Sequence, residues 1–262
     1  MRGKNICSAE NPTFKSFLKL TSAHGIKKGG VTILSGPKQT KEVLRDFPEK
    51  CTGIITCATF EQLPLETEIG IPSFALSPDL FRRIDLFNTG HPLLLVKVPP
   101  LPDFNARVRT HGCTLLIPFQ DPANVGAVIR TAAAFGVSRV VMMKESAHPF
   151  HPKALRSAGS NLFRVPLFKG PELAEIECTG TQQIVTLSPK GQDVEDFRFP
   201  PSFCLVPGLE GPGLPDSLRN TTSICIPMRK DVDSLNAAMA TGIALYLWRK
   251  EIGTGSNKKA HP

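Results

Sequence analysis

Three segments of the sequence combine small residues with a few polar side chains, a composition that allows close approach to a ligand. The first covers residues 121–137, DPANVGAVIRTAAAFGV, where Asn124 stands at an expected helix start and Arg130 follows six residues later. The start of a helix after a strand favours phosphate and other anions, through its unpaired N–H groups and the helix dipole. The pattern by itself favours the alternative of a capped, alanine-rich core helix with one solvated arginine.

The second segment covers residues 205–214, LVPGLEGPGL, a buried strand that leads into a turn. Its glycines, Gly208, Gly211 and Gly213, permit a positive φ and a close backbone approach to a ligand, with Glu210 held between them. The segment matches neither GxxxxGK(S/T) nor GxGxxG, so it is not one of the usual phosphate-binding loops. A strand-to-helix turn punctuated by glycine and proline is the alternative.

The third segment covers residues 224–246, ICIPMRKDVDSLNAAMATGIALY. Pro227 ends a buried strand, a charged loop follows, and Ser234 is expected to begin a helix of mostly small residues. Ser234 and Asn236 are ordinary capping residues, so two caps and a tightly packed helix form the alternative. The run of alanine and glycine allows an unusually close backbone contact along this helix.

The composition limits the classes of protein to which the chain can belong. It has 262 residues, of which 41% are hydrophobic and 21% charged, enough for one large or two modest packed domains. The 31 Lys and Arg against 23 Asp and Glu give a net charge of +8, which favours a polyanionic partner. We expect a cytoplasmic protein without a membrane span, because the sequence has neither a signal peptide nor a long apolar stretch.

The cysteines and histidines do not indicate a metal centre. The seven cysteines include no CxxC pair, which argues against a disulfide scaffold and against a structural zinc site. His148 and His151, in HPFHP, lack partner ligands at metal spacing and are expected to be loop residues. We therefore expect no bound metal.

The elements that position these segments form two α/β parts. In the first, strands are expected at residues 29–36, 52–59 and 93–98, and helices at 12–20, 38–47 and 77–87. The stretch 99–112, PPLPDFNARVRTHG, is rich in proline and charge and is typical of an exposed linker. We therefore predict a small α/β domain over residues 1–104.

Residues 105–252 repeat the alternation more strongly. Helices are expected from Asn124 and at 153–162, 172–178 and 235–250, and strands at 115–119, 138–143, 164–168, 182–188, 202–208 and 223–228. Strands separated by helices of this length predict a mostly parallel sheet with helices on both faces. Residues 253–262 are expected to form a flexible tail.

At its three segments the chain resembles the SpoU/TrmH family of RNA ribose 2′-O-methyltransferases, in the SPOUT superfamily. DPANVGAVIRTAAAFGV, LVPGLEGPGLP and IPMRKDVDSLNAAMATGIA are similar to the family's three motifs in order and spacing, and the resemblance covers roughly residues 113–250. Residues 1–98 resemble more loosely the small α/β substrate-binding domain of many members. The resemblance implies an enzyme that uses S-adenosylmethionine on ribosomal or transfer RNA. It also implies a deep trefoil knot in the C-terminal domain and a homodimer that packs through the helix at 235–250.

The resemblance also assigns roles to individual residues. It implies that backbone groups hold S-adenosylmethionine, namely those of Gly208, Ile226, Leu235 and, as a weaker candidate, Leu187 or a neighbour in VTLSP, residues 185–189. It implies that Arg130 is the catalytic arginine and that it and the target ribose are oriented by Asn124, Glu210, Ser234 and Asn236. Because a guanidinium with a pKa above about 12 is a poor proton acceptor, we expect Arg130 to grip a phosphate and stabilise alkoxide charge.

Three other functions fit part of the pattern. A non-catalytic RNA-binding protein with a vestigial knot domain is the chief alternative, although the intact motif residues count against decay. A Rossmann-type oxidoreductase fits the alternating strands and helices, but the sequence lacks GxGxxG and an acidic residue about 20 positions later. A base-methylating relative in the same superfamily is the third.

Overall fold

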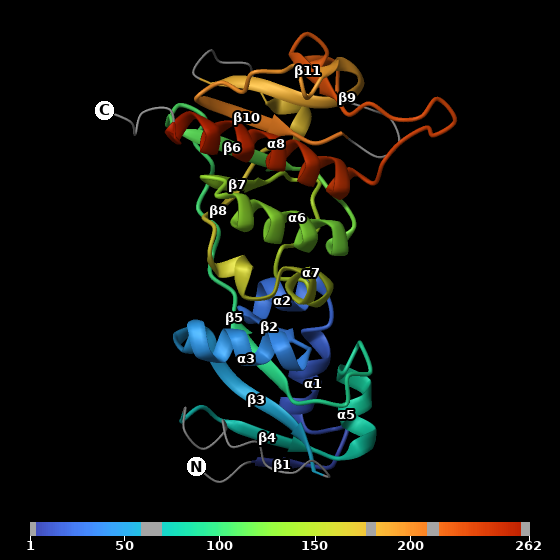
Figure 1. The fold of residues 1–262 in the computed structure, drawn as a ribbon. Coiled ribbons are helices and arrows are strands. Elements are labelled where there is room, and N and C mark those ends of the chain that lie inside the picture. The colour runs from blue at the N-terminus through green and yellow to red at the C-terminus, as the bar shows by residue number, and fades with distance from the viewer. Residues whose placement is uncertain (1–3, 59–69, 177–181, 209–214, 258–262) are drawn as a thin grey trace. The chain divides into compact units, whose positions relative to one another are not determined.

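The computed structural model describes residues 4–58, 70–176, 182–208 and 215–257 (Figure 1). The chain forms two compact units, one of residues 1–100 and 148–163 and the other of residues 101–147 and 164–262. Each unit contains its own sheet.

The first unit is built on a five-stranded mixed sheet. Its strands lie in the order β1-β4-β3-β5-β2, with the bounds β1 (Lys4–Ile6), β2 (Val31–Leu34), β3 (Cys51–Cys57), β4 (Ser73–Leu76) and β5 (Leu93–Lys97). Strands β1, β4 and β3 run parallel, whereas β5 is antiparallel to both of its neighbours. The strands predicted at 29–36, 52–59 and 93–98 are confirmed as β2, β3 and β5, and β1 and β4 are additional to those predicted.

Helices cover this sheet because their apolar sides pack against the buried residues of its strands. They are α1 (Pro12–Lys19), α2 (Ala23–Gly29), α3 (Pro37–Asp46) and α5 (Pro78–Ile84), with a 3-10 turn η1 (Pro48–Lys50). Asn11 Oδ1 accepts a hydrogen bond from Thr13 N at 2.9 Å, which starts α1 where the sequence predicts. Phe14 and Phe81 are buried in one cluster with strand residues of this sheet. Burying such a side chain contributes about 1.5–3 kcal/mol.

Residues 148–163 belong to the first unit, although they lie far along the chain. They form α7 (Pro152–Ala158) and the 3-10 turn η2 (Gly159–Phe163). Thr32 Oγ1 of β2 donates a buried hydrogen bond to the carbonyl oxygen of Phe150 at 2.7 Å, and Ser160 Oγ lies 3.4 Å from Glu42 Oε2 of α3. The predicted domain of residues 105–252 is therefore not one continuous compact unit. Apolar periodicity marks α7 as buried but does not identify the element that buries it.

A cut at residue 105 would separate this segment from the strand and helix that cover it. Phe150, Ala154 and Leu155 are almost fully buried, and a fragment of residues 106–262 would expose them. Full-length variants are therefore the appropriate material for experiments on the second unit.

The second unit is built on a six-stranded sheet in which every pairing is parallel. The order is β11-β9-β10-β6-β7-β8, with the bounds β6 (Gly112–Ile117), β7 (Arg139–Met142), β8 (Leu167–Lys169), β9 (Gln183–Asp193), β10 (Ser202–Val206) and β11 (Thr222–Cys225). The predicted parallel sheet is confirmed. Two helices, α6 (Pro122–Phe135) and α8 (Ala237–Asn257), lie side by side along it (Figure 1). Trp248 of α8 packs edge-on against Phe203 of β10, with ring centroids 5.9 Å apart.

Several predicted boundaries in this unit are wrong. Helix α6 begins at Pro122, because Asp121 Oδ1 rather than Asn124 accepts the capping hydrogen bond from Ala123 N at 2.9 Å. Helix α8 begins at Ala237 and continues to Asn257, into the segment predicted as a tail. In the part of residues 172–178 that the structure describes, only a 3-10 turn η3 (Leu173–Glu175) forms. Another 3-10 turn, η4 (Asp216–Leu218), precedes β11.

The stretch predicted as an exposed linker is held to the second unit from residue 103 onward. Arg139 is central to this attachment: its guanidinium lies over the ring of Phe104, 4.9 Å from the centroid, and its Nη2 donates to the carbonyl oxygen of Val108 at 2.8 Å. Ser202 Oγ donates to the carbonyl oxygen of Thr110 at 2.7 Å. Polar side chains at the amino ends of β7 and β10 therefore hold this segment to the second unit, although its composition is typical of an exposed linker.

Cys7, Cys51, Cys113, Cys204 and Cys225 are free thiols. Burial raises the pKa of Cys51 and of Cys204 to about 11, and it raises the pKa of Cys113 well above its usual value. In the described residues no group of three or more His, Cys, Asp or Glu is placed to hold a metal ion. No helix among them has the length and apolar character needed to cross a bilayer.

The pairing of β9 with β11 is interrupted in the middle. Val185 and Thr186 pair with Thr222 and Ser223, and the ladder then resumes at Gln192 and Asp193 while β11 advances by a single residue. Residues 187–191 of β9 therefore have no partner in β11 and form an irregularity in the pairing of the two strands. At Gly191 the backbone of Ile224 comes so close that an added Cβ would lie 2.5 Å from its N and C atoms.

We expect Gly191→Ala to lower the free energy of unfolding by at least about 2 kcal/mol, because two backbone segments would have to separate. Gly253→Ala is the matched control, since its Cβ would meet nothing within 4 Å. At this exposed position of α8, Gly253→Ala should leave the free energy of unfolding unchanged or raise it by up to about 1 kcal/mol. Thermal unfolding of both variants checks this, and equal melting temperatures would contradict the close approach at Gly191.

Candidate functional site

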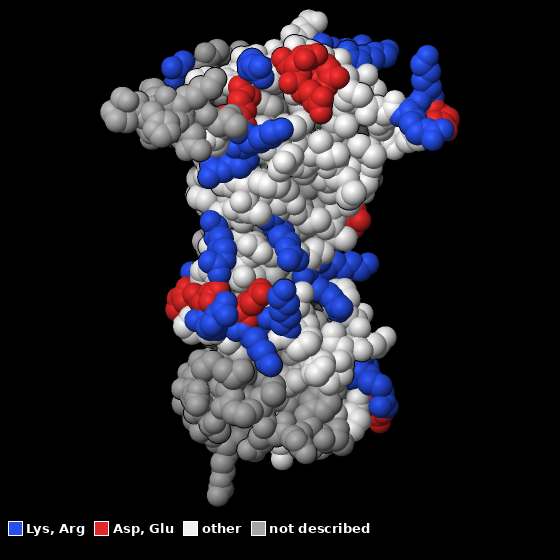
Figure 2. All heavy atoms as spheres, in the orientation of Figure 1, with Lys and Arg blue, Asp and Glu red and all other residues white. Residues whose placement is uncertain are grey.

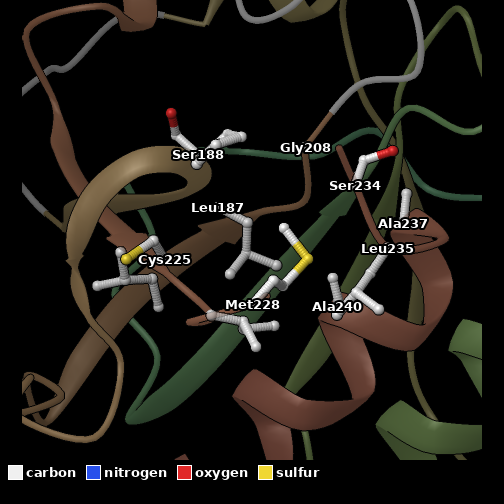
Figure 3. A pocket seen from close by; sticks show the side chains of 12 residues that line it. Leu187, Ser188, Gly208, Cys225, Met228, Ser234, Leu235, Ala237 and Ala240 are labelled. Carbon is white, nitrogen blue, oxygen red and sulfur yellow. The ribbon is translucent and has the colours of Figure 1, made fainter. Parts of the chain in front are cut away.

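A pocket of about 400 Å³ opens at the carboxyl ends of β10 and β11, against the middle of β9 and beside the start of α8 (Figure 3). Ligand sites of parallel α/β sheets lie at this end of the strands. The volume falls in the range of about 300–1,000 Å³ found for small-molecule and cofactor sites. Its lining residues are Leu187, Ser188, Pro189, Gly208, Ile224, Cys225, Ile226, Met228, Ser234, Leu235, Ala237 and Ala240.

The structure brings together all four residues that the sequence assigns to cofactor binding. Gly208, Ile226, Leu235 and Leu187 line this one pocket, although they come from different segments of the chain. Ser234, assigned to the catalytic group, lines it as well. Their convergence follows from the topology, because parallel strands bring their carboxyl ends to the same edge of the sheet.

The interrupted strand β9 supplies one wall of the pocket. Leu187, Ser188 and Pro189 lie in the stretch that leaves the ladder, so they face the ends of β10 and β11 instead of pairing with them. A Cβ on Gly208 would lie 3.2 Å from the carbonyl oxygen of Leu187, which is tight for a carbon–oxygen contact. The pocket is therefore narrow between Gly208 and Leu187, and glycine keeps it open there.

The walls offer apolar side chains and backbone polar groups. Figure 3 shows the side chains of Leu187, Met228 and Leu235 between the strand ends and the first turn of α8. None of the lining residues that the structure describes is charged, and Ser188 and Ser234 carry hydroxyl groups. Strand ends also present N–H and C=O groups that the sheet does not use. Such a site suits a ligand with a flat apolar part whose edges donate and accept hydrogen bonds.

Some lining residues were not predicted as site residues. They include Cys225 and Met228, together with Ala237 and Ala240. Cys225 and Met228 flank Ile226, which was predicted, so their place after a buried strand was the available signal. Nothing in the sequence indicates that residues 187–191 have no partner in β11, apart from Pro189 and Gly191 within a strand-like run.

Asn236 and Asn124 form a link beside the pocket. Asn236 Oδ1 accepts hydrogen bonds from Ala238 N at 3.0 Å and from Met239 N at 3.2 Å, and so caps α8. Its Nδ2 donates to Asn124 Oδ1 of α6 at 3.3 Å. One side chain therefore starts the third motif's helix and also holds it to the first motif.

The predicted catalytic arginine lies apart from the pocket wall. Arg130 is exposed on α6 and is not a lining residue. The spacing of four, three and four residues places it on one exposed helix face with Ala123, Ala127 and Ala134. Glu210 lies outside the described residues.

Comparison with known proteins adds independent observations. The model of the SpoU rRNA Methylase family matches residues 113–246. The 23S rRNA (guanosine(2553)-2′-O)-methyltransferase RlmP of Bacillus subtilis is 29% identical over 93% of this chain and 98% of its own length. The ribosomal RNA small subunit methyltransferase G 2 of Syntrophobacter fumaroxidans is 45% identical over 99% of this chain. The chain spans only about half, 51%, of that relative's length.

Solved structures share the fold over nearly the whole chain. The AdoMet-bound rRNA methyltransferase of Sinorhizobium meliloti has a TM-score of 0.78 at 22% identity, covering 95% of this chain and 98% of its own. The SpoU methyltransferase AviRb of Streptomyces viridochromogenes, in complex with AdoMet, has a TM-score of 0.75 at 22% identity, covering 93% and 100%. At this identity the likeness establishes a common α/β fold with a parallel sheet.

The two hydrogen-bonding roles of Asn236 can be separated. Asn236→Ala should lower the free energy of unfolding by about 1–2 kcal/mol, because Ala238 N and Met239 N lose their acceptor. Asn236→Asp keeps the acceptor, places a negative charge at the helix start and loses the donor to Asn124, so its stability should stay near the wild type. Urea unfolding of both variants is the measurement. An Asp variant as unstable as the Ala variant would show that the link to Asn124, rather than the cap, stabilises this region.

Proposed function

The chain belongs to the SpoU rRNA Methylase family, and we propose that it transfers a methyl group from S-adenosylmethionine to a ribose 2′-hydroxyl in structured RNA. The observation that carries the proposal is the meeting of Leu187, Gly208, Ile226 and Leu235 in one pocket at the strand ends. The named relatives act on ribosomal RNA, so ribosomal RNA is the first substrate to test. Such an enzyme meets its substrate in the cytoplasm.

The pocket fits the methyl donor in size and chemistry. Apolar side chains such as Leu187 and Leu235 suit the faces of an adenine ring, and strand-end N–H and C=O groups suit its edge. When bound, S-adenosylmethionine supplies an activated methyl group on a sulfonium. Gly208 keeps the space open, and Ser234 contributes a hydroxyl at the side where α8 begins.

The protein's part in the reaction is alignment and charge stabilisation. Holding the 2′-oxygen in line with the methyl carbon contributes up to about 7–11 kcal/mol. Arg130 is a permanent cation, so it grips the phosphate next to the target ribose and stabilises negative charge that develops on the 2′-oxygen. The proton then leaves to water or to that phosphate. Asn124 and Asn236 position the start of α6 relative to α8, and we assign the same orienting role to Ser234 and Glu210.

We propose that two copies of the chain assemble through α6 and α8. Met239, Ile243 and Tyr246 are spaced by four and three residues on one face of α8 and are 64%, 36% and 53% exposed. Phe135 of α6 packs near Tyr246, with ring centroids 6.1 Å apart. An exposed apolar face of this kind is typical of a protein interface. Arg130 lies on the neighbouring exposed face of α6, so we propose that each copy supplies Arg130 to the pocket of its partner.

We further propose a knotted chain in the second unit and an RNA-binding role for the first. At Gly191 the backbone of Ile224 leaves no room for a Cβ. This close passage of β11 beside the stretch 187–191 supports the proposed knot. The mixed sheet of the first unit with its lysine-bearing helices supports binding of a polyanion.

The strand order disfavours a Rossmann-type oxidoreductase. In that fold the strands would follow β8-β7-β6-β9-β10-β11. Here β10 lies next to β6, and β9 lies outside it. The non-catalytic alternative is decided by an assay: S-adenosylmethionine binding by calorimetry, followed by nucleoside mass spectrometry of RNA treated with the protein. A ribose-methylated nucleoside supports the proposal, a methylated base supports the base-methylating alternative, and no product contradicts catalysis.

Substitutions at Gly208 test the cofactor pocket. Gly208→Ala adds a Cβ 3.2 Å from the carbonyl oxygen of Leu187, and we expect about tenfold weaker binding of S-adenosylmethionine. Gly208→Val adds two further methyl groups and should weaken it by about a hundredfold or more. Isothermal titration calorimetry measures both, with circular dichroism as the folding control. Wild-type affinity in the Val variant would place the cofactor elsewhere.

Substitution of Arg130 tests the catalytic role and the assembly together. Arg130→Ala should reduce methyl transfer by about 10²–10³-fold while leaving S-adenosylmethionine affinity within twofold, because the side chain does not line the pocket. Mixing Arg130→Ala subunits with Gly208→Val subunits should restore activity, since a mixed dimer holds one intact pocket facing one intact Arg130. Wild-type turnover by Arg130→Ala would remove Arg130 from the mechanism, and failure of the mixture would place Arg130 and the pocket in the same subunit.

A further inference from the structure

Two stretches of the sequence contain no acidic residue. Residues 11–41 hold six lysines and no Asp or Glu, and residues 146–171 hold two lysines, two arginines and two histidines and again no Asp or Glu. They are separated by more than a hundred residues, so their shared composition is not a local charge run. The chain as a whole carries 23 acidic residues, which makes the two gaps notable.

The first unit brings the two stretches together. The hydrogen bond from Thr32 Oγ1 to the carbonyl oxygen of Phe150 joins β2 to the segment before α7, and α2 and α7 both pack on β2. Gly25 of α2 comes against the backbone of Lys19 at the end of α1, where a Cβ would have no room. Helices α2 and α7 therefore belong to one body. We name their exposed polar residues, with the histidines before α7, the α2/α7 surface: His24, Lys27, Lys28, His148, His151 and Lys153.

The lysines of the α2/α7 surface are exposed and are not neutralised. Lys27, Lys28 and Lys153 are exposed, and none of them takes part in an ion pair among the residues that the structure describes. Over α3, by contrast, acidic residues alternate with basic ones. Figure 2 shows basic side chains over the part of the first unit that holds α2 and α7, and mixed charges over α3.

The two histidines of HPFHP contribute neutral donors. His148 Nδ1 accepts from Phe150 N, and His151 Nδ1 accepts from Lys153 N, both at 3.2 Å. Burial, the charge of Lys27 and that of His151 lower the pKa of His148 to about 4, and burial and the charge of Lys153 lower that of His151. Both imidazoles are therefore neutral near pH 7 and carry their proton on Nε2.

We propose that the α2/α7 surface binds the phosphodiester backbone of the RNA substrate, with lysine ammonium groups and histidine Nε2–H groups contacting phosphate oxygens. This inference rests on the proposed function and specifies where the RNA is held. Neither α2 nor α7 carries an exposed large apolar side chain, so the surface offers no platform for stacked bases. Recognition here is of phosphates rather than of sequence.

Charge removal with two matched controls tests the surface. The test protein carries Lys27→Gln, Lys28→Gln and Lys153→Gln. The first control carries Lys27→Arg, Lys28→Arg and Lys153→Arg, which keeps the charge. The second carries Lys4→Gln, Lys50→Gln and Arg82→Gln, which removes the same charge elsewhere on the first unit. The probe is unmodified 23S rRNA made by transcription, and its binding is measured by filter retention at several salt concentrations.

We expect the test protein to bind this RNA at least about tenfold more weakly at 100 mM salt, with the slope of log affinity against log salt reduced by about 2–3. Both controls should stay within about threefold of the wild type. Unchanged affinity in the test protein, or an equal loss in the second control, would overturn the assignment.

Cofactor binding and methyl transfer separate this inference from the proposed function. The test protein should bind S-adenosylmethionine like the wild type and should methylate RNA with a raised KM and little change in kcat. If the wild type methylates RNA and the test protein does so with the same KM, the assignment of RNA binding to the α2/α7 surface is wrong and the proposed function stands. A wild type that neither binds nor methylates RNA would overturn both proposals.

Discussion

The second unit depends on the stretch where β9 leaves its ladder with β11. Residues 187–191 make room for a wall of the pocket, and the ladder closes again at Gln192. The detour requires the backbones at Gly191 and Ile224 to approach more closely than any side chain permits. A strand that simply continued would pair with β11 throughout and fill the space that the pocket occupies. Strand irregularities of this kind occur beside active sites, where they redirect side chains.

A pocket formed by backbone groups has chemical consequences. It binds its ligand by shape and by main-chain hydrogen bonds, and among the described lining residues none is charged. The charge that the reaction needs must then come from outside the wall. Arg130 on the exposed face of α6 is a permanent cation, and under the proposed assembly it meets the pocket of a second copy. Donor binding and charge stabilisation are thus carried by different surfaces of the same unit.

The chain crosses between the two units more than once, so they are not joined by a single linker. The chain passes from the first unit to the second after residue 100, returns for residues 148–163 and then leaves again. Arg139 and Ser202 hold residues 104–110 to the strand ends of the second unit. Phe150 and Leu155 are buried in the first unit by β2 and its neighbours. A segment inside the family-matched region therefore contributes to the surface that we assign to RNA phosphate binding.

The sequence by itself determined the family and the parallel sheet, because strand and helix periodicity and the three motifs are local properties of the chain. It also assigned Gly208, Ile226, Leu235 and Leu187 to one site, and these four residues line the same pocket. It misplaced the cap of α6, the start of α8 and the partner of α7, since a capping hydrogen bond or a burial partner depends on which atoms meet in space. Only the tertiary structure decided that residues 187–191 have no partner in β11, that Asn236 links two motifs, and that two acid-free stretches form one surface. These are contacts between distant parts of the chain, and no local pattern encodes them.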